Sequence, residues 1–124
     1  MLAPLGRGGI ATVYLACTKS GDEVAIKVIH PHLRGDARLV RHLKDEALLV
    51  QRIGHPNVVD VIELGEGIDG FYIVMEYVEG VTLADLFERA AEEDDAIDAP
   101  IAMRIVTDVL GGLHAAHELV GPDR

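Results

Sequence analysis

A single lysine interrupts a run of β-branched and small apolar residues, Val24-Ala25-Ile26-Lys27-Val28-Ile29. If this run forms a strand, alternate side chains face opposite sides, and Lys27 shares its side with Ala25 and Ile29. An ammonium group on such an apolar side needs an anion. The anion is either a carboxylate elsewhere in the chain or the phosphates of a bound ligand. In the alternative, the strand lies at an edge and the flexible Lys27 side chain carries its charge into solvent.

The segment Gly6-Arg7-Gly8-Gly9, upstream of this run, is rich in glycine. Three glycines within four residues permit backbone conformations closed to other residues. The segment Thr12-Val13-Tyr14-Leu15 that follows favours a strand. A Rossmann fingerprint would begin a helix here, and a Walker loop would place Gly-Lys-Ser/Thr directly after the glycines. The pattern therefore predicts a β-hairpin with a glycine-rich tip, before the strand that carries Lys27.

A carboxylate partner for Lys27 is suggested by the next element, a helix predicted over residues 36–53. Asp36 supplies an N-cap and Gly54 a C-terminal stop. Four apolar residues fall within about 80° of one another on one face of this helix: Leu39, Leu43, Val50 and Ile53. Glu46 falls at the centre of the same stripe. Because an unpaired carboxylate there would be costly, we expect Glu46 and Lys27 to form an ion pair.

The remaining segments complete an α+β pattern. Strands are predicted over residues 58–66 and 71–77, joined by a turn with the hairpin signal Asp69-Gly70. Helices are predicted over residues 82–91 and 100–118, the second ended by Gly121-Pro122, with the acidic segment 92–95 as a solvated linker. We therefore expect one sheet of five strands with one helix in residues 1–78, followed by helices in residues 79–124.

Composition narrows the function. The chain has 124 residues and a net charge of -10, which argues against a nucleic-acid backbone or an anionic membrane as the main partner. No segment approaches the roughly 20 apolar residues needed to span a bilayer. Cys17 is the only cysteine, which fits a reducing cytoplasm. The six histidines lack the three or four convergent ligands of a zinc site, so no metal site is expected.

The chain resembles, over almost its whole length, the first part of a bacterial Hanks-type (eukaryotic-like) Ser/Thr protein kinase domain. Five motifs in the right order carry the resemblance: Leu5-Gly6-x-Gly8-x-x-Ala11-x-Val13, Val24-Ala25-Ile26-Lys27, Glu46, His55-Pro56-Asn57 and Met75-Glu76-Tyr77-Val78-Glu79-Gly80. Each motif is weak alone, but together they are specific. The resemblance implies a protein kinase-like fold, with a nucleotide-binding lobe in residues 1–78 and the first helices of a second, helical lobe in residues 79–124.

The resemblance also implies an ATP site and the roles of its residues. Gly6 and Gly8 would let the backbone approach phosphate. Lys27 would hold the α- and β-phosphates, and Glu46 would position Lys27. The expected adenine contacts are Leu5, Val13 and Ala25 above the ring, Met75 at the back of the pocket, and the main chain of Glu76 and Val78. In the complete domain this chemistry transfers a phosphoryl group from ATP, with Mg²⁺, to a protein Ser or Thr.

The sequence departs from the family pattern in two ways. Ala11 replaces the third glycine of the loop. Residues 1–124 also contain neither the catalytic-loop aspartate and asparagine nor the Asp-Phe-Gly metal ligand. We therefore expect this chain alone to bind nucleotide weakly, to lack phosphotransferase activity, and to associate through the apolar last helix. Two alternatives remain open: a non-catalytic nucleotide-binding or interaction module, and a truncated gene product without a function of its own.

Overall fold

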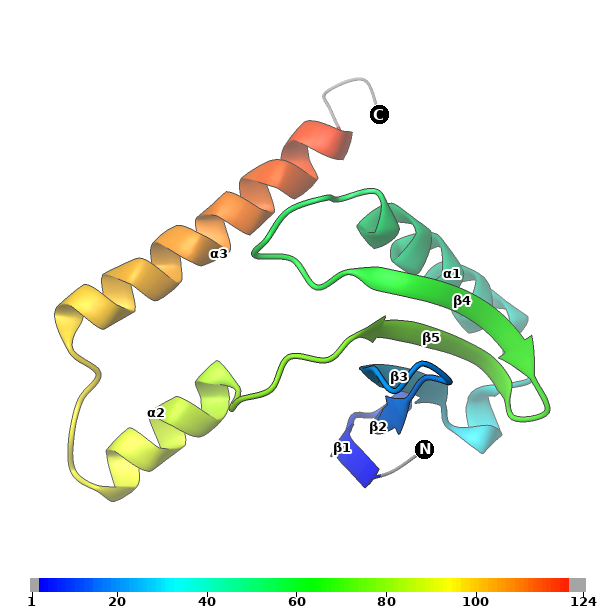
Figure 1. The fold of residues 1–124 in the computed structure, drawn as a ribbon, viewed down its shortest axis with the longest axis horizontal. Helices are drawn as coiled ribbons and strands as arrows, with labels where there is room; N and C mark the ends of the chain where they lie inside the picture. The colour runs from blue at the N-terminus through cyan, green and yellow to red at the C-terminus, as the bar shows by residue number, and fades with distance from the viewer. Residues whose placement is uncertain (1–2, 121–124) are drawn as a thin grey trace. The chain divides into compact units, whose positions relative to one another are not determined.

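The computed structural model describes residues 3–120, and the predicted stop at Gly121-Pro122 lies outside this range. The elements follow in the order β1 (Ala3–Arg7), β2 (Ala11–Cys17), β3 (Glu23–Ile29), the 3-10 turn η1 (Pro31–Leu33), α1 (Ala37–Gln51), β4 (Val61–Gly67), β5 (Gly70–Glu76), α2 (Leu83–Glu92) and α3 (Ala99–Val120) (Figure 1). The chain divides into two units, Met1–Tyr77 and Val78–Arg124, which are described separately below.

The first unit is built on a five-stranded antiparallel sheet with strand order β1-β2-β3-β5-β4. The predicted α+β class and the predicted five strands are thereby confirmed. β4 begins at Val61, three residues later than predicted. A turn precedes the strand, because the Val58 N–H donates to the His55 carbonyl at 3.1 Å, so residues 55–58 are not extended.

The two faces of the sheet carry different cores. On one face, Ile29, Phe71 and Ile73 pack with Ala47 of α1. On the other face, Ala16, Val24 and Val74 form a smaller cluster with Ile26 and Tyr72. We call the first the inner face and the second the outer face. The alternation of each strand assigns its side chains to one face or the other.

Helix α1 begins as predicted and ends two residues early. The Asp36 side chain accepts a hydrogen bond from the Leu39 N–H at 3.1 Å, which confirms the N-cap. Arg52 is the C-cap, so Ile53 lies beyond the helix, where it is nevertheless buried. The turn η1, with Pro31 at its first position, was not predicted from the sequence.

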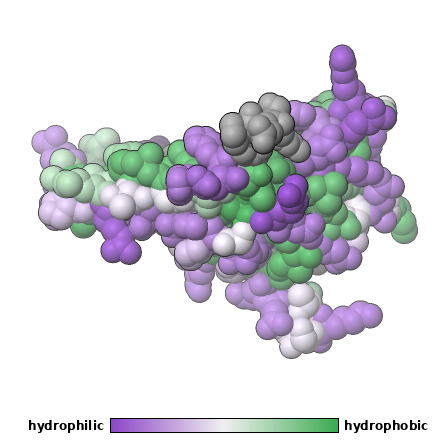
Figure 2. Space-filling model, turned by 90° about the horizontal axis from the view of Figure 1, so that it is seen from above, coloured by the Kyte–Doolittle hydropathy of each residue, from purple (hydrophilic) through white to green (hydrophobic). Residues whose placement is uncertain are grey.

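The second unit consists of α2 and α3. Thr82 caps α2 in a full capping box with Asp85, as the sequence predicted. Large apolar side chains of this unit remain exposed: Val81, Leu83, Phe87, Ile101, Met103, Val106, Val109, Leu110 and Leu113. Apolar residues reach the molecular surface in several patches (Figure 2). Within the described residues, neither helix has the length and apolar character that a membrane span requires.

Candidate functional site

Strand register brings four of the predicted site residues onto the inner face. Val13 of β2 lies opposite Lys27 of β3, and Ala25 of β3 lies opposite Met75 of β5. Because directly opposed residues of antiparallel strands share a face, all four side chains project from the same side of the sheet. Ala25 is buried, while Val13, Lys27 and Met75 are half-buried. The inner face therefore presents one ammonium group among apolar side chains.

The glycine-rich segment forms the tip of the β1–β2 hairpin, where the Gly8 N–H donates to the Ala11 carbonyl at 2.9 Å. Gly6, Gly8 and Gly9 do not have a positive φ, so the hairpin tip in this arrangement does not use the left-handed conformations that glycine permits. Their small size has another consequence. A Cβ atom at Gly6 would meet no atom within 4 Å, and one at Gly8 would make only ordinary contact. The space beside this backbone is open to a ligand.

Ala11, which stands in place of the family's third glycine, is a packed residue. Its side chain is only 5% exposed and lies at the start of β2, opposite Ile29. A methyl group is therefore accommodated at this position, packed on the inner face of the sheet. The departure from the motif leaves the hairpin tip intact.

Among residues 3–120, Lys27 has no carboxylate partner. Its ammonium makes no ion pair with any side chain in the described residues. Glu46 instead pairs with His42 of the same helix, with 3.2 Å between Nε2 and Oε1, and the Glu46 side chain is 61% exposed. The predicted Lys27–Glu46 ion pair is therefore absent, and the prediction that Glu46 points into the apolar side of α1 is wrong.

The rotation of α1 about its axis explains this correction. The most deeply buried residue of the helix is Ala47, 6% exposed, with Val40 and Leu43 packed on the same side. At roughly 100° per residue, Glu46 lies about 100° away from Ala47. The prediction from sequence counted Ile53, which lies beyond the helix, as part of the apolar face and did not count the small Ala47. The centre of the predicted apolar face was displaced toward Glu46 for that reason.

A second contact holds α1 in this rotation. The Lys44 ammonium forms an ion pair with Glu66 of β4 and also lies 5.4 Å from the centre of the Phe71 ring. Both partners belong to the two strands that α1 covers. Lys44 therefore joins the helix to the sheet on the side away from Glu46, and no sequence motif indicated this residue.

The remaining predicted nucleotide contacts are Leu5, Glu76 and Val78. Leu5 is 45% exposed, at the irregularity that shifts the β1–β2 register. The Glu76 N–H donates to the Asp60 carbonyl at 3.0 Å, and the Glu76 side chain accepts from the Asp60 N–H at 3.0 Å. Only the carbonyl of Glu76 could then serve an adenine edge. Val78 is the first residue of the second unit, so its predicted contact stays a prediction.

An antiparallel sheet with a glycine-tipped hairpin, a central-strand lysine and one covering helix is the arrangement that the resemblance to protein kinases predicts for the first part of the chain. A protein kinase domain model matches residues 1–120, and the chain belongs to this family. The predicted family is confirmed.

Curated relatives agree with this assignment. The chain is 38% identical to the serine/threonine-protein kinase PksC of Streptomyces coelicolor over 120 residues, covering 93% of this chain and 22% of the relative. It is 35% identical to the serine/threonine-protein kinase PrkC of Bacillus subtilis over 119 residues, covering 95% and 18%. It is also 34% identical to the tyrosine-protein kinase MasK of Myxococcus xanthus over 122 residues, covering 95% and 19%. The chain thus spans about a fifth of these relatives.

Solved structures show the same fold. The kinase domain of Mycobacterium tuberculosis PknI matches with a TM-score of 0.73 at 28% identity, covering 94% of this chain and 47% of that domain. The match includes the predicted α+β architecture, with a sheet-based first part and a helical second part.

Proposed function

We propose that the first unit binds ATP and forms the nucleotide-binding part of a protein kinase. One observation carries the proposal: the half-buried Lys27 has no protein anion within the described residues and lies on the same sheet face as Val13, Ala25 and Met75. An ammonium in this setting is stabilised by the phosphates of a ligand, and the apolar side chains suit a flat base.

The residues present fit the nucleotide. Lys27 would bind the α- and β-phosphates, with the main chain at Gly6 and Gly8 beside them. Leu5, Val13, Ala25 and Met75 would contact adenine, together with the main chain of Glu76 and Val78. Mg²⁺ neutralises the phosphates in this family when bound. Within residues 3–120 no group of three potential metal ligands exists, so the proposal assigns no residue of this chain to Mg²⁺.

Glu46 pairs with His42 and not with Lys27, so its proposed role needs a different arrangement of α1. To face Lys27, Glu46 would need α1 to turn about its own axis, and such a turn would take Ala47 out of the inner core and Lys44 away from Glu66. We therefore infer that Glu46 positions Lys27 in a second arrangement of α1, distinct from the one described above.

In the complete domain, the proposed reaction is transfer of the γ-phosphoryl group of ATP to the hydroxyl of a protein serine or threonine. Two of the three relatives described above carry the name serine/threonine-protein kinase and one carries the name tyrosine-protein kinase. The family resemblance and the names of the two serine/threonine kinases support transfer to serine or threonine.

Calorimetric titration with ATP tests the nucleotide site. We expect weak binding that is little changed by Mg²⁺ and falls at least tenfold in Lys27→Met, because the phosphate charge then lacks its counter-ion. Lys19→Met is the matched control, since Lys19 is an exposed lysine in the β2–β3 turn. Equal affinities in the two variants would remove Lys27 from the site. Tight binding that requires Mg²⁺ would reveal metal ligands that the proposal does not contain.

Phosphoryl transfer needs a second test. The polypeptide of residues 1–124 is expected to show no transfer from radiolabelled ATP to a generic protein substrate, because none of its carboxylates falls in a catalytic-loop motif. Turnover that disappears in Lys27→Met would contradict this expectation, whereas turnover retained in that variant would indicate a contaminating kinase.

A further inference from the structure

A polar hollow of about 300 Å³ lies on the outer face of the sheet. Its polar side chains come from β1, β2, the segment after β3, and the β4–β5 turn: Arg7, Thr12, Tyr14, His30, Arg34 and Asp69. We call this the outer hollow. In the strand register, Arg7 lies opposite Thr12, and Thr12 lies opposite Val28, so their side chains share one face of the sheet. Val28 follows Lys27 in β3, so the Lys27 side chain is on the other face. The outer hollow is therefore separate from the proposed nucleotide site.

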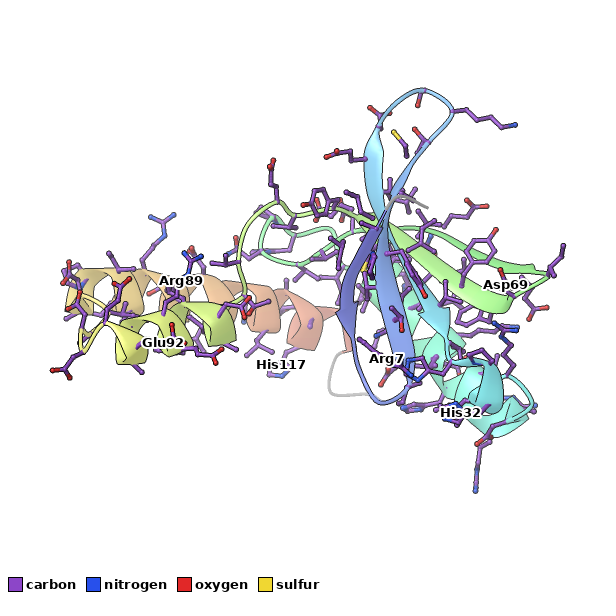
Figure 3. The ribbon with its side chains drawn as sticks, turned by 90° about the horizontal axis from the view of Figure 1, so that it is seen from below. Arg7, His32, Asp69, Arg89, Glu92 and His117 are labelled. Atoms are coloured by element: carbon purple, nitrogen blue, oxygen red, sulfur yellow. The ribbon has the colours of Figure 1, made fainter. Side chains whose placement is uncertain are left out.

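Two guanidinium groups border the outer hollow with little compensation. Arg7 is exposed and forms no ion pair within the described residues. Arg34 has only a long contact with Asp69, 4.0 Å between Nη2 and Oδ1, and Asp69 itself is 69% exposed. Two positive groups thus face one loosely held carboxylate. Figure 3 labels Arg7 on the β1–β2 hairpin and Asp69 at the β4–β5 turn.

Packing rather than the ion pair fixes the direction of Arg34. Its stem crosses the β4–β5 turn at Gly70, where an added Cβ would lie 3.1 Å from the Arg34 Cδ. Gly70 also has a φ of 88°, which favours glycine. A larger residue at position 70 would therefore displace Arg34, while glycine lets the guanidinium remain beside the outer hollow.

Hydroxyl and imidazole groups complete the polar lining. His30 is only 7% exposed, and its Nε2 lies 3.2 Å from the Thr12 Oγ1. The His30 N–H donates to the Ile10 carbonyl at 2.8 Å, which holds the residue in place. Thr12 is thereby oriented by a buried partner, and Tyr14 brings a second hydroxyl. Two guanidinium groups with two hydroxyls suit a phosphate, whose oxygens accept several hydrogen bonds.

An apolar hollow adjoins the polar one. It measures about 200 Å³, shares Val28 and Asp69 with the outer hollow, and is lined by Ile26, Ile68 and Tyr72. A ligand that carries an aromatic group beside its phosphate would use both. We propose that the outer hollow binds the phosphate of an organic monoester, with Arg7 and Arg34 as its counter-ions, and that the adjoining hollow takes the aromatic body.

Calorimetric titration of the chain with phenyl phosphate tests this proposal. We expect binding that is weakened at least fivefold in Arg7→Gln and in Arg34→Gln, and strengthened in Asp69→Asn, which removes the competing carboxylate. Arg38→Gln is the matched control, because Arg38 is an exposed arginine of α1 outside the outer hollow. It should bind as the unchanged chain does, and so should Lys27→Met.

Three outcomes of this titration would contradict the proposal. If Lys27→Met abolishes phenyl phosphate binding, the phosphate occupies the nucleotide site and the proposal fails, whatever the fate of the proposed function. If Arg38→Gln weakens binding as much as Arg7→Gln, the attraction is general and the proposal fails. Inorganic phosphate should bind more weakly than phenyl phosphate, and equal affinities would overturn the assignment of the aromatic body to the adjoining hollow. Far-ultraviolet circular dichroism of each variant verifies the fold.

Discussion

The chain has two phenylalanines, one in each unit, and they differ sharply in surroundings. Phe71 of β5 is 5% exposed in the inner core, whereas Phe87 of α2 is 55% exposed. The contrast extends to every buried apolar residue of the described range, because all of them belong to the first unit. The first unit therefore has a core of its own, and the helices of the second unit depend on local signals such as the Thr82 capping box.

The two units also differ in their numbers of charged residues. Residues 1–77 contain 8 basic and 10 acidic residues, whereas residues 78–124 contain 3 basic and 11 acidic ones. The acidity of the whole chain thus resides mainly in the second unit. A phosphate ligand is repelled much less by the first unit, which carries both Lys27 and the outer hollow. The net charge of the chain alone would not have indicated this.

Truncation of the two phenylalanines should have very different effects on stability. Phe71→Ala should lower the free energy of unfolding by about 3–5 kcal/mol, because it removes a buried ring and leaves a cavity. Phe87→Ala, the matched control, should change it by less than about 0.5 kcal/mol. Urea denaturation followed by circular dichroism measures both. Similar losses in the two variants would mean that α2 shares a core that the structure does not show.

The sequence predicted the elements of both units well, because their signals are local. Asp36 and Thr82 are caps whose geometry needs only a few neighbouring residues, and the turn at Asp69-Gly70 follows from one dipeptide. The face of Lys27 was also predictable, since strand alternation leaves no other choice once the strand is identified.

The rotation of α1 was not predictable in the same way. It depends on the burial of Ala47, a small residue that a helical projection weights lightly, and on the ion pair between Lys44 and Glu66, which are 22 residues apart. The contact between Asp60 and Glu76 likewise involves main-chain groups, which leave no trace in residue type. Local sequence signals determine where a helix or strand begins and ends. The rotation of a helix against a sheet depends on contacts between residues far apart in the sequence.

The long helix α3 of the second unit carries an exposed apolar stripe. Val106, Val109, Leu110 and Leu113 occur at helical spacing on α3 and are each about half exposed or more. Such a stripe favours association. Leu113→Glu should lower the association constant of the chain about tenfold, or about 1.4 kcal/mol, in sedimentation equilibrium. Thr107→Glu adds the same charge to an exposed position off the stripe and should have little effect. A monomeric unchanged chain would remove the basis of this prediction.

The ion pair between Lys44 and Glu66, which joins α1 to β4, should contribute little to stability. The side chains of Lys44 and Glu66 are 39% and 63% exposed, so solvent screens their ion pair strongly. Glu66→Gln should therefore lower the free energy of unfolding by only about 0.2–1 kcal/mol, and the loss should shrink in high salt. Glu63→Gln is the control, because Glu63 is an exposed glutamate of the same strand with no ion pair among the described residues.

The same substitution also tests the second arrangement of α1. Without the Lys44–Glu66 ion pair, turning the helix costs less, and Glu46 reaches Lys27 more often. A shift of this size can change an affinity only as far as it changes the population of the competent arrangement. ATP should therefore bind Glu66→Gln slightly more tightly than Glu63→Gln, by less than about fivefold, as 1 kcal/mol at most is released. Weaker ATP binding in Glu66→Gln would mean that the observed rotation of α1 is already the one that binds nucleotide, with Lys27 acting without Glu46.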